Sequence, residues 1–153
     1  MAQFNHVWLL DFDRTISSVD VVSRMVTHVC DDMGLDYSLL EREHARTEAR
    51  GESFVVTKLF KQLWPQFYAE FQERLHQVDH LESVFPDAAA FIDGLGKRGE
   101  RFVIITFGDR EWQMMKLRFS GLADRPYIVC ASPHKSDLIR SWQHGTMFKL
   151  SLD

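Results

Sequence analysis

The sequence predicts an α/β fold in which a parallel sheet is covered by helices on both faces. Strand-length segments that are almost wholly apolar are typical of strands buried on both sides, and the chain contains several of them. From about residue 84 onward these segments alternate with helical patterns, as parallel strands joined by helices do. A helical stretch, roughly residues 19–82, separates the first apolar strand from the next. We therefore expect a sheet whose first strand is followed by a large helical insertion.

The first predicted strand is "FNHVWLL", residues 4–10, which becomes wholly apolar just before Asp11. Apolar residues then recur at helical spacing, which predicts a series of helices up to about residue 82. Their boundaries are marked by Gly34, by a possible capping box of Ser38 with Glu41, by Gly51, and by Pro65 at the start of the last helix. Their apolar stripes contain Val22, Met25, Val26, Val29, Val56, Leu59, Phe60, Leu63, Phe67, Phe71, Leu75 and Val78.

Helix and strand alternate in the second half of the chain. Pro86 precedes a short helix, "DAAAFIDGLGKRG", which we expect to end at Gly96 and Gly99. "RFVIIT" is the second predicted strand and "YIVCA" the third, and the helix between them begins near Asp109, its expected N-cap. "HKSDLIRSW" predicts a further helix. The alternation in "MFKLSLD" is typical of an edge strand or a hairpin.

Composition and charge exclude several classes of protein. With 153 residues, 45% of them hydrophobic, the chain suits one compact domain with an inserted subdomain. The formal net charge of −4, with acids and bases interleaved, lacks the one-sided basic surface of a nucleic-acid-binding protein. The start of the chain has no secretory signal pattern, and no apolar run approaches the ~18 residues of a membrane span. Cys30 and Cys130 are isolated thiols, which suits a reducing compartment. We expect a cytoplasmic protein with neither nucleic acid nor a membrane as partner.

Polar side chains that can carry chemistry follow the predicted strands. Asp11 and Asp13 come after the first strand, Thr106 ends the second, and Lys135 lies just after the third. In a parallel α/β sheet, ligands bind beyond the carboxyl ends of the strands. The sequence therefore places two acids, a hydroxyl and an ammonium on one rim of the sheet.

Two carboxylates at such a rim repel each other unless a cation lies between them, and Mg²⁺ favours carboxylate and carbonyl oxygens. The cation in turn favours a phosphate. We expect Asp11 to attack phosphorus and become an aspartyl phosphate, and Asp13 to act first as general acid and then as general base. Thr106 would hydrogen-bond a phosphoryl oxygen, and Lys135 would screen that oxygen and the charge of Asp11.

These segments resemble the motifs of the haloacid dehalogenase-like (HAD) superfamily. "LLDFDRT" resembles the first motif, an Asp-x-Asp-x-Thr after an apolar strand. "VIIT", ending in Thr106, resembles the second motif, and "HKSDLI" with Lys135 resembles the third. The resemblance covers about residues 1–18 and 84–143, and it rests on the order of the motifs, because any one of them alone is weak.

The resemblance implies a Rossmann-like three-layer core made of residues 1–18 and 84–153, with residues 19–83 as an inserted all-helical cap. It also implies a Mg²⁺-dependent phosphohydrolase acting on a small phosphorylated metabolite. In that pattern Asp11 ligates the metal by its side chain and Asp13 by its backbone carbonyl. Candidate contacts to substrate or phosphate are Arg14, Thr15, Phe107 and Gly108. Arg14 could equally be a surface ion-pair residue, whereas Gly108 would let the backbone approach a phosphate.

The sequence departs from the family at its fourth motif, a strand followed by acids that complete the metal site. Few residues follow Lys135, and Asp153 is the one candidate for such an acid after the alternating segment. We expect instead that the chain stops before the fourth motif. A truncated or non-catalytic HAD-like protein is therefore the main alternative to an active phosphatase.

Other interpretations remain open. A phosphotransferase or mutase would share the aspartyl-phosphate step and differ only in the acceptor. A receiver-type signalling domain also places acids, a Thr and a Lys around Mg²⁺, but its phosphoacceptor usually follows a middle strand and its first strand is not followed by a large helical insertion. His76 and His80 have the i, i+4 spacing of a metal pair, yet Gln77 stands where a zinc protease has Glu, so we expect helix-surface histidines.

Overall fold

The computed structural model describes residues 2–4, 6–50, 55–78, 83–144 and 147–150. Its main sheet contains β2 (Trp8–Asp11), β3 (Phe102–Phe107) and β4 (Tyr127–Cys130). These strands are parallel and lie in the order β2-β3-β4. The predicted α/β class is confirmed. The finer description, a three-layer Rossmann-like core with a cap, stays a prediction.

The register of the sheet brings the strand ends together. Asp11, the last residue of β2, pairs with Ile105, and Thr106 pairs with Val129 of β4. All residues of β3 except the last are buried, which explains why this segment is apolar throughout. The carboxyl ends of the three strands therefore form one continuous rim.

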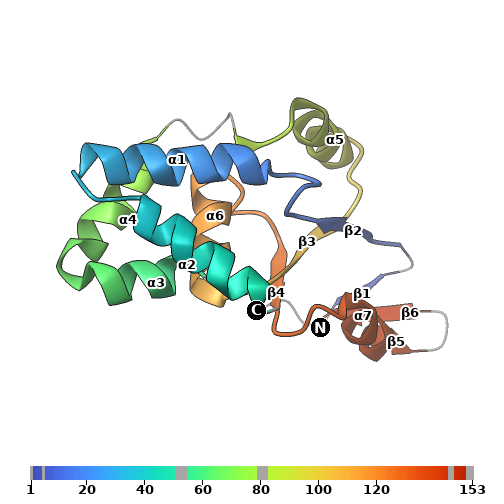
Figure 1. The fold of residues 1–153 in the computed structure, drawn as a ribbon. Coiled ribbons are helices and arrows are strands. Elements are labelled where there is room, and N and C mark those ends of the chain that lie inside the picture. Colours follow the sequence, from blue (N-terminus) through green and yellow to red (C-terminus); the bar gives the residue numbers. More distant parts are fainter. Residues whose placement is uncertain (1, 5, 51–54, 79–82, 145–146, 151–153) are drawn as a thin grey trace.

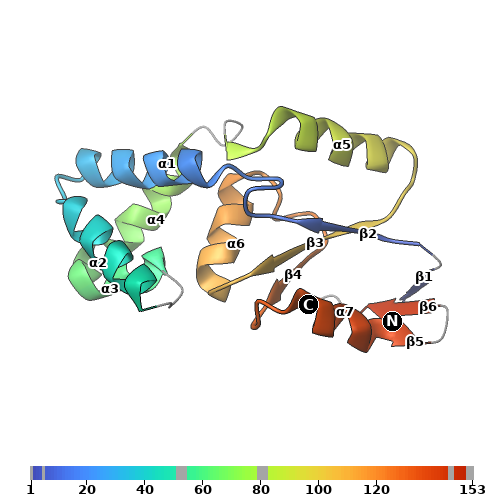
Figure 2. The ribbon, with the colours of Figure 1, turned by 45° about the vertical axis from the view of Figure 1, so that its right-hand side comes forward.

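Helices pack on both faces of the sheet (Figure 2). Ile104 faces α5 (Pro86–Lys97) and α6 (Arg110–Phe119), because it clusters with buried residues of these helices. Ile105 points to the opposite face, where it clusters with Trp142 of α7 (Lys135–Trp142). Neighbouring strand residues alternate between the two faces, so the apolar run of β3 supplies both clusters.

The helical stretch between β2 and β3 forms a separate apolar cluster with α6. It contains α1 (Val19–Asp32), α2 (Ser38–Ala49), α3 (Val56–Leu63), the 3₁₀ turn η1 (Pro65–Phe67) and α4 (Tyr68–Gln77). In Figures 1 and 2 these helices lie together on one side of the sheet, with α6 between them and the strands. Trp112, Met115 and Phe119 of α6 complete the cluster.

Several predicted helix boundaries differ from the structure. Asp36 rather than Ser38 caps the start of α2, because its Oδ1 accepts a hydrogen bond from the backbone N–H of Ser38 at 3.0 Å. Pro65 opens the 3₁₀ turn η1, and α4 begins only at Tyr68. Gly96 lies inside α5, and the helix ends just before Gly99, whose φ is 67°.

The predicted first strand over residues 4–10 is wrong, because two strands occupy this region. β1 (Ala2–Phe4) belongs to a second sheet, in which it pairs antiparallel with β6 (Met147–Leu150). β6 also pairs with β5 (Gln143–His144), which confirms the predicted hairpin for its described part, whereas the edge-strand alternative is wrong because β6 lies between β1 and β5. The predictions on Gly51, His80 and Asp153 lie outside the described residues.

None of the helices in the described part of the chain combines the length and the apolar character that a membrane crossing requires.

Candidate active site

The loop after β2 holds Asp11 and Asp13 on either side of a buried anchor. Phe12 has no exposed surface, and its carbonyl oxygen accepts hydrogen bonds at 2.9 Å from the backbone N–H groups of Ile16 and Ser17. Arg14 adopts a φ of 63°, in the left-handed region that non-glycine residues rarely occupy, and it lies in the tight turn after Phe12. The buried Phe12 and this turn leave the two flanking carboxylates on the solvent side of the rim, 48% and 32% exposed.

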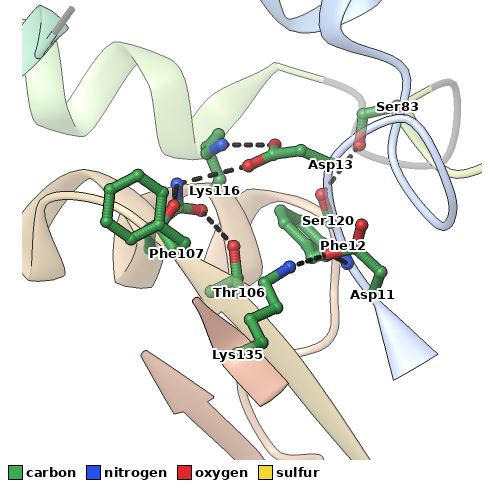
Figure 3. Close-up of polar contacts among 10 residues, drawn as sticks. Asp11, Phe12, Asp13, Ser83, Thr106, Phe107, Lys116, Ser120 and Lys135 are labelled. Carbon is green, nitrogen blue, oxygen red and sulfur yellow. Dashed lines mark hydrogen bonds and ion pairs between the residues drawn. The ribbon is translucent and has the colours of Figure 1, made fainter. Parts of the chain in front are cut away.

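Asp11 forms an ion pair with Lys135, the first residue of α7 (Figure 3). The Lys135 ammonium donates to Oδ1 of Asp11, which also accepts the backbone N–H of Phe12 at 2.9 Å. The two residues are 124 positions apart, and the parallel sheet brings them together. The structure thus places the predicted nucleophile and the predicted screening cation in direct contact.

Asp13 pairs with a lysine that the sequence analysis did not identify. Lys116 of α6 donates from Nζ to Oδ1 of Asp13, and its side chain is only 7% exposed. Burial lowers the pKa of Lys116 from its ordinary value, while the charge of Asp13 opposes this shift. Because a buried ammonium needs a counter-charge, Lys116 depends strongly on Asp13.

Gln113 connects Thr106 to Asp13. The buried Thr106 hydroxyl donates to Oε1 of Gln113 at 3.0 Å. Nε2 of Gln113 donates to the carbonyl oxygen of Phe107 at 2.9 Å and to Oδ2 of Asp13 at 3.2 Å. Thr106 therefore lies at the rim as predicted, but its hydroxyl hydrogen is directed to Gln113. Donating to a phosphoryl oxygen instead would require this hydroxyl to rotate.

Gly108 is required at its position for two reasons. Its φ of 138° lies outside the range that L side chains readily adopt, and a Cβ atom there would lie 2.8 Å from Nε2 of Gln113. Its N–H group points to the carbonyl oxygen of Cys130 at 3.4 Å. The following helix α6 is capped by Asp109, whose Oδ1 accepts the Trp112 N–H at 2.9 Å, as the sequence predicted.

A cavity of about 450 Å³ opens beside Asp13. Of the other candidates for substrate contact, Arg14, Phe107 and Gly108 line it, whereas the exposed Thr15 does not. Residues of α1, α2, α3 and α6 form the rest of the wall together with Tyr37 and Asp109, which precede α2 and α6. The helical stretch and the rim of the sheet therefore enclose a common space.

Asp11 and Asp13 have the chemistry that Mg²⁺ prefers. Within the described ranges, no three side chains of His, Cys, Asp or Glu come together as a metal site. Mg²⁺ does not need such a cluster, since it usually keeps several waters and binds one or two carboxylates together with substrate phosphate. The Asp11 carboxylate and the backbone carbonyl oxygen of Asp13 are ligands of this kind.

Lys116 and Gln113 are the site residues that the sequence analysis missed. They lie three positions apart on α6, so they project from neighbouring turns of one helix face. A polar pair of this kind looks like an ordinary solvated helix surface in a sequence. The one signal in the sequence was that the helix carrying both residues follows "VIITFGD", the segment that ends at the rim.

Comparison with known proteins gives only a distant likeness. No protein-family model matches the chain, and no curated protein sequence does. Among solved structures, the fold is similar to that of a proposed HAD-hydrolase, YfnB from Bacillus subtilis, solved bound to magnesium. The TM-score is 0.48 at 19% identity, over 81% of this chain and 63% of the other. The chain thus spans less than two thirds of that protein, and the likeness is too distant to establish a family.

Proposed function

We propose that this protein is a Mg²⁺-dependent phosphohydrolase of the HAD type that acts on a small phosphorylated metabolite through an aspartyl phosphate. The observation that carries the proposal is the pairing of two rim carboxylates with two lysines, Asp11 with Lys135 and Asp13 with Lys116. Carboxylates at the carboxyl ends of parallel strands suit a reaction at a bound anion, and the lysines supply the positive charge that attracts it.

In the first step, a carboxylate oxygen of Asp11 forms a bond to phosphorus while the bond from phosphorus to the ester oxygen of the substrate breaks. Asp13 acts as the general acid: for this step it carries a proton in place of its ion pair with Lys116, gives that proton to the departing oxygen, and the alcohol leaves. Lys135 is already bonded to Asp11 and can follow the charge as it moves onto the phosphoryl oxygens. The products of this step are the alcohol and an aspartyl phosphate on Asp11.

In the second step, water attacks the same phosphorus while Asp13, now ionised, removes its proton. The bond from phosphorus to Asp11 breaks, and inorganic phosphate leaves with Asp11 again a carboxylate. Gln113 and Lys116 hold Asp13 from two sides and so fix the carboxylate where both proton transfers occur. Asp13 can serve both steps because each step leaves it in the protonation state that the next one needs.

The oxygen atoms of Asp11 and Asp13 make this rim the expected site for Mg²⁺. Asp11 would hold Mg²⁺ by its side chain, and Asp13 by its backbone carbonyl oxygen. Bound there, the ion supplies positive charge that neutralises phosphoryl oxygens and reduces the repulsion between an anionic substrate and the carboxylates.

The helices α1–α4 fit the role of a cap over the rim. They line the cavity beside Asp13, so their movement relative to the sheet would open and close the site. Closure would exclude water during the first step, when water would compete with the Asp11 carboxylate for attack on phosphorus. On this interpretation, residues 1–18 and 84–153 are the catalytic core and residues 19–83 the cap.

The test is hydrolysis of 4-nitrophenyl phosphate by the purified protein with and without Mg²⁺. We expect Mg²⁺-dependent turnover, and its loss by at least about a thousandfold in Asp11→Asn with the fold intact by circular dichroism. Asp93→Asn, an exposed position on α5, is the matched control and should keep full activity. Unimpaired turnover in Asp11→Asn would remove Asp11 as the nucleophile. Transfer of phosphate to an added alcohol would instead favour a phosphotransferase.

A further inference from the structure

The cavity beside Asp13 has a polar mouth and an apolar wall. Asp13, Arg14 and Lys116 lie on its lining at the rim of the sheet. The wall away from the rim is formed by Val22 and Val26 of α1 together with residues from three other helices. The buried apolar residues on this wall are Val22, Val26, Leu40, Val56 and Trp112.

The two ends of the cavity match the two parts of a phosphate monoester. Asp13 lines the cavity, whereas Asp11 is not one of its lining residues. In the proposed reaction Asp13 protonates the leaving oxygen, so the alcohol lies on the Asp13 side of phosphorus. The alcohol portion of the substrate must therefore enter this cavity, and its wall selects the alcohol.

Among the described residues, the wall away from the rim offers few partners for alcohol hydroxyls. Ser23, Tyr37 and His44 are its polar side chains, and the hydroxyls of Ser23 and Tyr37 are bonded to each other at 3.2 Å. Asp13 is already bonded to Lys116 and Gln113, and Asp109 caps α6. A polyhydroxylated alcohol has more hydroxyl groups than this wall has polar side chains, so some of its hydroxyls would lie against apolar surface, which is unfavourable. An apolar alcohol would instead bury its surface against the valines and Leu40.

We propose that this cavity binds the alcohol portion of phosphate monoesters whose alcohol is largely apolar, and that it disfavours sugar phosphates. The inference rests on the proposed phosphohydrolase function and names its substrate class. The volume, about 450 Å³, lies within the ordinary range for small-ligand sites.

The test compares cyclohexylmethyl phosphate with glucose 6-phosphate. Both are esters of a primary alcohol on a six-membered ring, so their leaving groups are similar and the comparison reports on the ring. We expect kcat/KM to be at least about tenfold higher for cyclohexylmethyl phosphate. Equal or higher kcat/KM for glucose 6-phosphate would overturn the inference while leaving the phosphohydrolase function in place.

Two isosteric variants test whether the cavity wall causes the preference for an apolar alcohol. Val26→Thr puts a hydroxyl on the cavity wall, and we expect it to reduce the preference for cyclohexylmethyl phosphate by about three- to tenfold. Val29→Thr, on the same helix and also buried but not on the cavity wall, is the matched control and should leave the preference unchanged. Equal effects of the two variants would contradict the assignment of this wall.

A binding experiment separates failure of the inference from failure of the proposed function. Asp11→Asn should bind cyclohexylmethyl phosphate more tightly than glucose 6-phosphate by calorimetry, with no turnover needed. Preferential binding without hydrolysis of any ester by the wild type would keep the cavity's preference and overturn the phosphohydrolase function. Lack of binding to cyclohexylmethyl phosphate would overturn the inference directly.

Discussion

Lys116 and Asp13 form an ion pair in which the two sides are buried to very different degrees. The lysine side chain is 7% exposed and the aspartate 32%, although the residues lie 103 positions apart in the sequence. The ammonium also lies 5.5 Å from the centre of the Phe12 ring and 5.9 Å from that of Trp112. Removing Asp13 should therefore cost the fold more than removing Lys116, because the buried ammonium has less access to water than the aspartate has.

This asymmetry predicts unequal effects of removing the two partners. Asp13→Asn leaves the buried ammonium without its counter-charge, and we expect it to lower the free energy of unfolding by roughly 2–4 kcal/mol. Lys116→Met leaves a partly exposed carboxylate and keeps the apolar volume, so it should cost about 1 kcal/mol or less. Urea unfolding measures both. Equal losses would contradict the view that Lys116 is the dependent partner.

Gln113 satisfies several polar groups at once, so its removal should be costly. Gln113→Leu leaves the Thr106 hydroxyl and the Phe107 carbonyl without their partner, and we expect a loss of about 1–3 kcal/mol in the free energy of unfolding. Gln62→Leu, at an exposed position of α3, is the control and should change stability by about 0.5 kcal/mol or less. Similar losses in both variants would show that the Gln113 network contributes little.

Two glycine-to-alanine substitutions should change the free energy of unfolding in opposite directions. Gly108→Ala combines a strained φ of 138° with a contact at 2.8 Å to Gln113, so we expect it to destabilise the fold by about 1–3 kcal/mol. Gly96→Ala lies inside α5 with nothing within 4 Å of the new Cβ, and it should stabilise the protein by about 0.5–1 kcal/mol. Thermal unfolding of the two variants against the wild type checks both signs. A stabilising Gly108→Ala would show that the turn before α6 is not as tight as described.

The contact of Glu111 on α6 with Lys61 of α3 and Tyr68 of α4 should depend on pH. Hydrogen bonds from Lys61 and then Tyr68 lower the pKa of Glu111 below its ordinary value of 4.5. A carboxyl group whose pKa is lowered by folding stabilises the fold fully when the pH is above its ordinary pKa. This contribution is lost as the pH falls through the pKa of the folded state.

Glu111→Gln should therefore destabilise the protein near pH 7 and have less effect near pH 3. The pair with Lys61 is 44% exposed on both sides, so we expect a loss of at most about 1 kcal/mol at neutral pH. Urea midpoints of wild type and variant at the two pH values provide the measurement. A difference that does not change with pH would contradict an ionic contribution.

The sequence predicted the rim because its signal is local. An apolar strand ending on Asp11 and another ending on Thr106 each show in a few consecutive residues, and parallel pairing then places their ends together. The prediction of one strand over residues 4–10 failed because β1 pairs with β6 from the far end of the chain. Such a non-local pairing leaves no trace in the local pattern.

Lys116 and Gln113 escaped prediction for a related reason. Their burial arises from the packing of α6 against the loop that carries Asp13, and a helix surface reads as solvated until that partner is known. The cap of α2 was misassigned because Asp36 and Ser38 are both good local acceptors, and only the structure shows which side chain bonds a backbone N–H.

The most direct test of the account is chemical trapping of the phosphorylated residue. Wild-type protein turning over 4-nitrophenyl phosphate with Mg²⁺ is quenched into hydroxylamine, which converts an acyl phosphate into a hydroxamate, and peptides are mapped by mass spectrometry. We predict a hydroxamate on Asp11 and none in Asp11→Asn. Turnover with a hydroxamate on another residue, or with none at all, would contradict nucleophilic catalysis by Asp11.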